Sequence, residues 1–226
     1  MNIDFANLKL QYQKYKNDID NNIQAVLNKS NYILGEEVHE LEEKLEKFTS
    51  VKHAITCSSG TDALLLAMMA MDIQPGDEII TTPFTWVSTA ETIVLLKAKP
   101  VFVDIEPETF NIDIRLIESA ITKNTKAIMP VSLFGQPADI DQIQIIAKKH
   151  NLKVIIDGAQ SFGSTYKNKT DSNLGNISIT SFFPSKPLGC YGDGGAVFTN
   201  NDDYAKKIKM LRVHGQNKRN YHKYIG

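Results

Sequence analysis

The chain has 226 residues, of which 42% are hydrophobic and 23% charged, and its formal net charge is −1. This length and composition are typical of a water-soluble protein with one large folded domain, and the small net charge gives no electrostatic reason to expect nucleic acid or an anionic membrane as a partner. The two cysteines, Cys57 and Cys190, lack the spacing of a metal site, and so few cysteines predict a cytoplasmic protein without disulfides.

Residues 1–50 are expected to form an N-terminal helical segment ahead of a main domain at 51–226. The segment begins without the basic stretch and apolar core of a secretory signal peptide. Apolar residues recur in it at the spacing of one helix face, namely Val38, Leu41, Leu45 and Phe48. This pattern predicts an amphipathic helix over 36–48. No apolar run anywhere in the chain has the length of a membrane span.

The main domain is expected to alternate short strands with helices. Seven apolar, β-rich runs predict strands at 54–57, 78–82, 100–104, 126–131, 154–157, 177–182 and 195–199. Helical patterns lie between them, near 61–72, 87–97, 113–121, 139–150 and 202–213. Nearly continuous apolar strands that alternate with helices predict an α/β fold, with a mostly parallel sheet covered by helices on both faces.

In an open α/β sheet, ligands bind beyond the carboxyl ends of the strands, so polar residues just past a strand are candidates for a site. The first such run, Ser58-Ser59-Gly60-Thr61, precedes an apolar helix. Gly60 would let the backbone approach an anion, which the free N–H groups of a helix N-terminus bind. Ser, Thr and Asp are equally typical of an ordinary helix N-cap, so both interpretations stay open. The chain contains neither a P-loop nor a Gly-x-Gly-x-x-Gly motif, which disfavours a nicotinamide-dependent dehydrogenase.

Two further candidates follow later strands. Trp86 is the only tryptophan; its flat ring can stack on a planar ligand, or it can pack in a core or an interface. Asp157 ends the apolar run Val154-Ile155-Ile156, and an ionised carboxylate buried there needs a partner. A pyridinium N–H would satisfy it, and capping of a helix is the alternative.

Lys186 lies about thirty residues after Asp157, in the turn beyond the next strand. Pyridoxal phosphate (PLP) chemistry needs a lysine that forms an imine and a carboxylate that keeps the pyridine nitrogen protonated. Ser181, at the end of the strand before Lys186, has a hydroxyl that could contact the phosphate. Most single lysines are solvated surface residues, but the order and spacing of these candidates together predict a PLP site.

The segments around these residues resemble the DegT/DnrJ/EryC1/StrS family of PLP-dependent nucleotide-sugar aminotransferases. The resemblance rests on Ser59-Gly60-Thr61-Asp62-Ala63-Leu64, Thr85-Trp86-Val87-Ser88-Thr89-Ala90, Asp157-Gly158-Ala159-Gln160-Ser161-Phe162-Gly163 and Ser181-Phe182-Phe183-Pro184-Ser185-Lys186-Pro187-Leu188-Gly189. It extends from Tyr32-Ile33-Leu34-Gly35-Glu36-Glu37-Val38 near the start to Arg212-Val213-His214-Gly215 near the end. It implies the large domain of fold type I, with a seven-stranded sheet.

The resemblance also implies a role for each matching residue. Lys186 would be the Schiff-base lysine, and Asp157 would be the partner of the pyridine nitrogen. Trp86 would stack on the ring, and Gln160 would contact its phenolic oxygen. The phosphate would be bound by three residues, through the backbone amides of Gly60 and Thr61 and the hydroxyl of Ser181. The active site would lie at the interface of a homodimer.

The run 183–195 is most similar to family members that aminate C3 of UDP-linked 3-keto-hexuronic acids, which serve synthesis of bacterial surface polysaccharides such as lipopolysaccharide. L-Glutamate would donate the amino group and leave as 2-oxoglutarate, and Lys186 would move the proton between the cofactor's C4′ carbon and the sugar carbon. Relatives that act on 4-keto or dTDP-linked 3-keto sugars share most of this motif and stay open as alternatives. Dehydratases of the family have histidine in place of this lysine, so Lys186 disfavours that reaction.

The chain departs from the family in two respects. Gly158 stands where the family commonly has alanine or a similar small residue. Full-length members are considerably longer and have a smaller C-terminal domain, which we expect to be absent here, so that the PLP-binding large domain at 51–226 would be incomplete. An inactive truncated or vestigial PLP-binding protein is therefore the alternative to an active enzyme.

Overall fold

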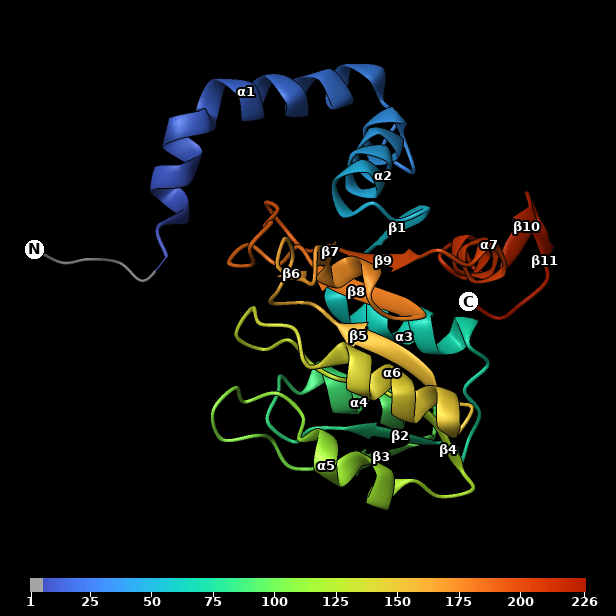
Figure 1. Ribbon diagram of the computed structural model, residues 1–226. Helices are drawn as coiled ribbons and strands as arrows, with labels where there is room; N and C mark the ends of the chain where they lie inside the picture. Colours follow the sequence, from blue (N-terminus) through green and yellow to red (C-terminus); the bar gives the residue numbers. More distant parts are fainter. Residues whose placement is uncertain (1–5) are drawn as a thin grey trace, which may run out of the picture.

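The computed structural model describes residues 6–226, and a seven-stranded sheet forms its centre (Figure 1). The strands are β1 (His53–Cys57), β2 (Glu78–Thr81), β3 (Lys99–Phe102), β4 (Thr125–Ile128), β5 (Lys153–Asp157), β8 (Ile177–Ser181) and β9 (Gly195–Thr199). They are ordered β1-β9-β8-β5-β4-β2-β3. β9 is antiparallel to both of its neighbours, and the other six strands run in one direction. The predicted α/β fold with a mostly parallel sheet is confirmed.

Helices cover both faces of this sheet (Figure 1). They are α2 (Glu36–Thr49), α3 (Gly60–Ala70), α4 (Ser88–Leu95), α5 (Ile114–Ile117), α6 (Ile140–Lys149) and α7 (Asp202–Leu211). Successive side chains of a strand point to opposite faces, so Ile155 packs with α3, α4 and α7, whereas Ile156 packs with α5 and α6. α2 covers the β1–β9 end of the second face. Each predicted helix of the main domain is present, and the helix predicted over 36–48 is α2.

An additional helix, α1 (Leu8–Lys29), precedes α2 and stands away from the body of the molecule (Figure 1). It buries none of its own side chains, and its apolar residues are exposed, among them Leu10, Tyr15, Ile23 and Leu27. One ring contact joins it to the main domain, between Tyr12 and Tyr191, with centroids 6.1 Å apart. The division of the chain at residue 50 stays a prediction, and residues 1–5 of the segment lie outside the described part. Among the described helices, none is long and apolar enough to cross a membrane.

The sequence patterns did not predict the smallest elements. These are the hairpin of β6 (Thr165–Tyr166) and β7 (Lys169–Thr170), the hairpin of β10 (Gln216–Lys218) and β11 (Tyr221–His222), and the 3₁₀ turn η2 (Asp171–Asn173). The helix predicted near 113–121 is formed by α5 and the 3₁₀ turn η1 (Glu118–Ala120) that follows it. Segments of two or three mostly polar residues carry no readable periodicity. Lys167 and Asn168, with φ of 47° and 67°, form the tight turn between β6 and β7.

A buried ion pair ties three elements together beside the start of α3. Arg212, at the end of α7, pairs through Nη1 with Oε1 of Glu42 in α2, and the two side chains are only 11% and 9% exposed. Arg212 Nη1 also donates to the carbonyl of Thr56 in β1 (3.0 Å), and the Thr56 amide donates to Glu42 (2.9 Å). The pair therefore fixes the end of β1, four residues before Gly60.

Arg212→Met is expected to lower the free energy of unfolding by about 3 kcal/mol, because it leaves the Glu42 carboxylate buried without its cation. Urea denaturation measures this loss. Lys44→Met is the matched control, since Lys44 pairs with Glu40 in the same helix while the two side chains are 72% and 62% exposed, and such pairs contribute less than about 1 kcal/mol. Equal losses of unfolding free energy in the two variants would show that the burial of the Glu42–Arg212 pair does not increase its contribution to stability.

Candidate active site

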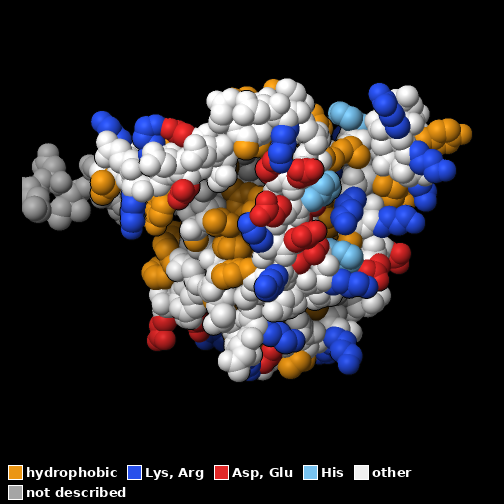
Figure 2. Space-filling model, turned by 90° about the horizontal axis from the view of Figure 1, so that it is seen from above, with side chains coloured by type: hydrophobic (Ala, Val, Ile, Leu, Met, Phe, Trp, Pro, Cys, Tyr) orange, Lys and Arg blue, Asp and Glu red, His pale blue; other side chains and the backbone are white. Residues whose placement is uncertain are grey.

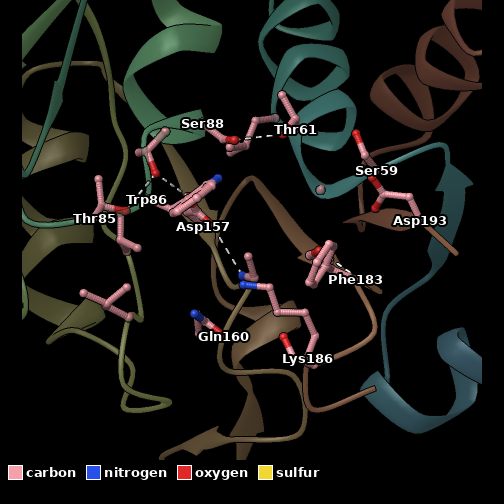
Figure 3. Close-up of a pocket in the computed structure, with 18 residues that line it drawn as sticks. Ser59, Thr61, Thr85, Trp86, Ser88, Asp157, Gln160, Phe183, Lys186 and Asp193 are labelled. Carbon is pink, nitrogen blue, oxygen red and sulfur yellow. Dashed lines mark hydrogen bonds between the residues drawn. The ribbon is translucent and has the colours of Figure 1, made fainter. Parts of the chain in front are cut away.

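A cavity of about 430 Å³ lies at the carboxyl edge of the sheet (Figure 3). This volume is within the range of roughly 300–1,000 Å³ that is typical of small-molecule sites. The cavity is lined by all seven residues that the sequence singled out: Gly60, Thr61, Trp86, Asp157, Gln160, Ser181 and Lys186. They come from the start of α3, the loop after β2, and the ends of β5 and β8 with the segments that follow. The structure thus brings the candidates together, and the role of each stays a prediction.

The start of α3 forms one wall of the cavity. Ser59 is the N-cap of this helix, and its side chain accepts a hydrogen bond from the Asp62 amide (3.0 Å). The preceding N–H groups, those of Gly60 and Thr61, have no partner within the helix because of its geometry. A Cβ at Gly60 would lie 2.7 Å from the Cβ of Ser181, so only glycine lets the helix start this close to β8. Capping and an anion-binding helix terminus therefore coexist here.

Asp157 ends β5 and is 4% exposed. Its Oδ2 accepts a hydrogen bond from Thr89 Oγ1 (2.8 Å), and its Oδ1 accepts one from the Ala159 amide (3.3 Å). Burial is the main cause that raises the pKa of Asp157, while these two donors and the positive charge of Lys186 oppose the rise. Residues 158–163 form turns rather than a helix, so the helix-capping interpretation of Asp157 is wrong. The carboxylate still favours an additional positively charged partner.

Lys186 lies in the turn after β8, and its half-buried side chain extends toward Asp157 (Figure 3). The turn is held by the Lys186 amide, which donates to the carbonyl of Phe183 (2.8 Å). Burial lowers the pKa of Lys186, and the negative charge of Asp157 partly opposes this. A lysine with a lowered pKa is more often a neutral amine, which is the form that attacks a carbonyl carbon.

Trp86 and Gln160 complete the walls and are both exposed. The Trp86 side chain is 71% exposed, so it is not a core residue. Its ring is free to stack on a planar ligand in the cavity or to contact a partner chain. Gln160 follows Asp157 by three residues in the same turn, which directs an amide group to the cavity that the carboxylate also lines.

Sequence analysis assigned no role to two further polar residues that line the cavity, Ser88 and Thr89. Thr89, in the first turn of α4, links Asp157 to Thr85 through a 2.9 Å contact between the two threonine hydroxyls. Ser88 lies 2.8 Å from the Thr61 hydroxyl. The run Thr85-Trp86-Val87-Ser88-Thr89 was visible in the sequence, but only the folded position of α4 shows that the Thr89 hydroxyl reaches Asp157.

Comparison with known proteins identifies the family. The sequence profile of the DegT/DnrJ/EryC1/StrS aminotransferase family matches residues 13–226. The chain belongs to this family. A UDP-2-acetamido-2-deoxy-3-oxo-D-glucuronate aminotransferase from Pseudomonas aeruginosa is 55% identical to it over 224 residues, which cover 99% of this chain and 62% of that protein.

Solved structures related to this DegT/DnrJ/EryC1/StrS chain show the same fold. A DegT/DnrJ/EryC1/StrS aminotransferase from Brucella abortus matches with a TM-score of 0.96 at 38% identity, covering 100% of this chain and 62% of that chain. NtdA from Bacillus subtilis, solved with the bound cofactor PMP, matches with a TM-score of 0.92 at 34% identity, covering 99% of this chain and 51% of that one. The fold of a PLP-dependent transferase large domain is confirmed. The chain spans about three fifths of the length of the curated relatives it matches first.

Asp157→Asn is expected to stabilise the unliganded protein at pH 7 by about 1 kcal/mol, or roughly 2–4 °C in thermal midpoint for a chain of this size. The pKa of Asp157 is raised in the folded state, so the folded carboxyl keeps a proton that the unfolded chain loses above its ordinary pKa of about 3.9. The folded protein therefore loses stability as the pH rises from the unfolded pKa to the raised pKa of the folded state. Asparagine has no titrating carboxyl group and avoids this loss. Thermal unfolding of wild type and variant at pH 4 and pH 7 measures it.

Asp193→Asn is the matched control for this prediction, because Asp193 lines the same cavity but is exposed. It is expected to leave the thermal midpoint unchanged at both pH values. A gain from Asp157→Asn that is as large at pH 4 as at pH 7 would contradict the assigned cause.

Proposed function

We propose that the chain is the cofactor-binding domain of a PLP-dependent aminotransferase that moves an amino group from L-glutamate to a nucleotide-linked keto sugar. The observation that carries the proposal is the arrangement of Asp157 and Lys186 in one cavity. Asp157 is a buried carboxylate that favours a positively charged partner, and Lys186 is a half-buried lysine with a lowered pKa. A pyridinium ring bearing an aldehyde meets both requirements at once.

The residues of the cavity fit the parts of PLP. Asp157 would hold the pyridinium N–H, and Lys186 would bind the aldehyde carbon covalently. Trp86 would lie on the ring face, and Gln160 would donate to the phenolic oxygen. The phosphate group would occupy the N-terminus of α3, where Gly60, Thr61 and Ser181 lie together.

The side chains then divide the work of transamination. Bound PLP supplies an electron sink that stabilises negative charge on the carbon bearing the amino group. Lys186 would take the proton from that carbon and return it one position away, as a general base and then a general acid. The negative charge of Asp157 would keep the ring nitrogen protonated throughout, and Thr89 would hold the carboxylate in place through its 2.8 Å hydrogen bond.

For the acceptor we propose a UDP-linked 3-keto sugar of the hexuronic acid class, used in the synthesis of a bacterial surface polysaccharide. Support comes from the 55% identity to the Pseudomonas aeruginosa UDP-2-acetamido-2-deoxy-3-oxo-D-glucuronate aminotransferase.

We further propose a cytoplasmic homodimer. Its support is the group of large apolar side chains that remain exposed on this chain, including Trp86, Phe134, Phe183 and Tyr191. Figure 2 shows hydrophobic side chains gathered in a hollow on the face seen from above. Of the four exposed aromatic residues, Trp86 and Phe183 line the cavity, and Phe134 and Tyr191 lie within two residues of other lining residues, so a second subunit that covered them would also close the site.

Lys186→Ala is expected to abolish transamination from glutamate and the visible absorption band that appears when PLP is added. The alanine has no amine to bind the aldehyde or to move the proton. Absorbance after PLP addition and 2-oxoglutarate formation measure the two losses. Lys206→Ala, in α7, is the control and should leave both unchanged. Transamination retained by Lys186→Ala would refute the assignment.

Gly60→Ala is expected to weaken PLP binding at least tenfold, because the added Cβ would lie 2.7 Å from the Cβ of Ser181 and push the helix start away from it. Pyridoxal lacks the phosphate and should lose far less affinity. Absorbance titrations with the two compounds measure the difference. An equal loss for both would contradict a phosphate site at the start of α3.

A further inference from the structure

A second carboxyl group is buried beneath the turn that carries Asp157. Asp171, the first residue of η2, is 1% exposed and does not line the cavity. Its Oδ2 accepts a hydrogen bond from Ser161 Oγ, and Ser161 is also 1% exposed. Its Oδ1 is buried with no hydrogen-bond partner among the described residues. Burying a carboxyl group this way is costly, so its place in the structure calls for a reason.

Gly158 gives this carboxyl group its space. A Cβ at Gly158 would lie 3.1 Å from Asp171 Oδ2, 3.2 Å from Ser161 Oγ and 2.8 Å from the carbonyl of Ile179. The backbone next to Asp157 therefore packs directly on the Asp171–Ser161 pair, with no side chain between them. The glycine and the buried carboxyl group form one packing unit.

Backbone hydrogen bonds tie the same unit to the turn. The Ser161 amide donates to the Gly158 carbonyl (3.1 Å), and the Ser164 amide donates to the Ser161 carbonyl (2.8 Å). The Asp171 amide then donates to the Ser164 carbonyl (2.9 Å). Asp171 thus holds both ends of the segment 161–164 through its side chain and its backbone. The turn immediately before that segment carries Asp157 and Gln160, both of which line the cavity.

We propose that Asp171 is a positioning residue that acts through Ser161 to fix the turn bearing Asp157 and Gln160 for the cofactor ring. The proposal rests on the cofactor site proposed above. Without the link, the turn would keep its backbone hydrogen bonds, the bond from the Ala159 amide to Asp157 and a 3.4 Å bond from Thr180 to the Gly158 carbonyl, but no side chain would hold Ser161, and a ligand would have to order that end of the turn on binding. Pre-organised groups bind more tightly because that ordering cost is already met.

The charges around Asp171 favour its role as a hydrogen-bond acceptor for Ser161. Burial and the neighbouring charge of Asp157 raise the pKa of Asp171 to about 6, while the hydroxyls of Ser161 and Ser132 oppose the rise. At pH 8 the group is therefore ionised and is a strong acceptor for Ser161. Lys186 is the cation that acts on Asp157 on the cavity side.

The test uses Trp86, the only tryptophan of the chain, as a probe in the cavity wall. Quenching of its fluorescence by pyridoxamine phosphate, which has no aldehyde, gives a dissociation constant without covalent binding. Ser161→Ala and Asp171→Ala are expected to weaken this binding at least tenfold at pH 8. Asp171→Asn keeps an oxygen that accepts from Ser161 and is expected to stay within about threefold of wild type.

Ser172→Ala controls for a general loss of stability, because Ser172 is a buried neighbour in η2 whose side chain makes no hydrogen bond to the turn among the described residues. It is expected to keep wild-type affinity. Wild-type affinity in Ser161→Ala, or a loss in Ser172→Ala equal to that in Ser161→Ala, would overturn the proposal. So would a loss in Asp171→Asn as large as that in Asp171→Ala. Should Asp171→Ala fail to fold, Ser161→Ala decides.

Thermal unfolding in the absence of ligand tests the same assignment. The pKa of Asp171 is raised from its ordinary value, so the folded protein loses stability as the pH rises from about 4 to about 6. Asp171→Asn removes that loss, and its thermal midpoint relative to wild type is expected to rise over this interval. A flat difference would contradict a buried, titrating Asp171. Failure of the wild type to bind pyridoxamine phosphate would instead refute the cofactor site itself.

Discussion

The carboxylate of Asp157 lies at the end of a central strand, where it is only 4% exposed and an unpaired negative charge is costly. Neighbouring groups stabilise the carboxylate in this buried position. Thr89 donates to one of its oxygens and the Ala159 amide to the other. Lys186 extends toward Asp157, and its positive charge opposes the rise in the pKa of Asp157. The negative charge of Asp157 in turn partly opposes the lowering of the pKa of Lys186 by burial. Asp157 thus interacts with a hydroxyl group, a backbone amide and a lysine from three different segments.

Separate parts of the fold converge on the cavity that contains Asp157. Six strands run in one direction, so their carboxyl ends, with the loops that follow, share one edge of the sheet. α3 starts against the end of β8 because Gly60 has no side chain, and the Glu42–Arg212 pair holds β1 just before it. On the opposite side of the turn from the cavity, Asp171 and Ser161 support the backbone between Asp157 and Gln160. The position of the cavity residues therefore depends on contacts that lie outside the cavity as well as on contacts within it.

Membership of the DegT/DnrJ/EryC1/StrS family and the fold are established, and the chain spans about three fifths of the length of its curated relatives. The cavity is open, and Trp86 in its wall is 71% exposed. α1 leaves its apolar side chains exposed in the same way. These surfaces are consistent with a site that other chain segments or a second subunit would cover.

The sequence by itself determined the order of strands and helices along the chain, because continuous apolar runs mark the buried strands and a 3.6-residue periodicity marks the helices. It also determined the candidate residues from Gly60 to Lys186, since each stands just past a strand. Only the tertiary structure decided which neighbours surround Asp157. Thr89 and Asp171 are 68 and 14 residues away in the chain, and nothing local marks them as partners of that turn. The small hairpins and the exposure of Trp86 were likewise decided by packing, because burial depends on which elements meet rather than on the residue type.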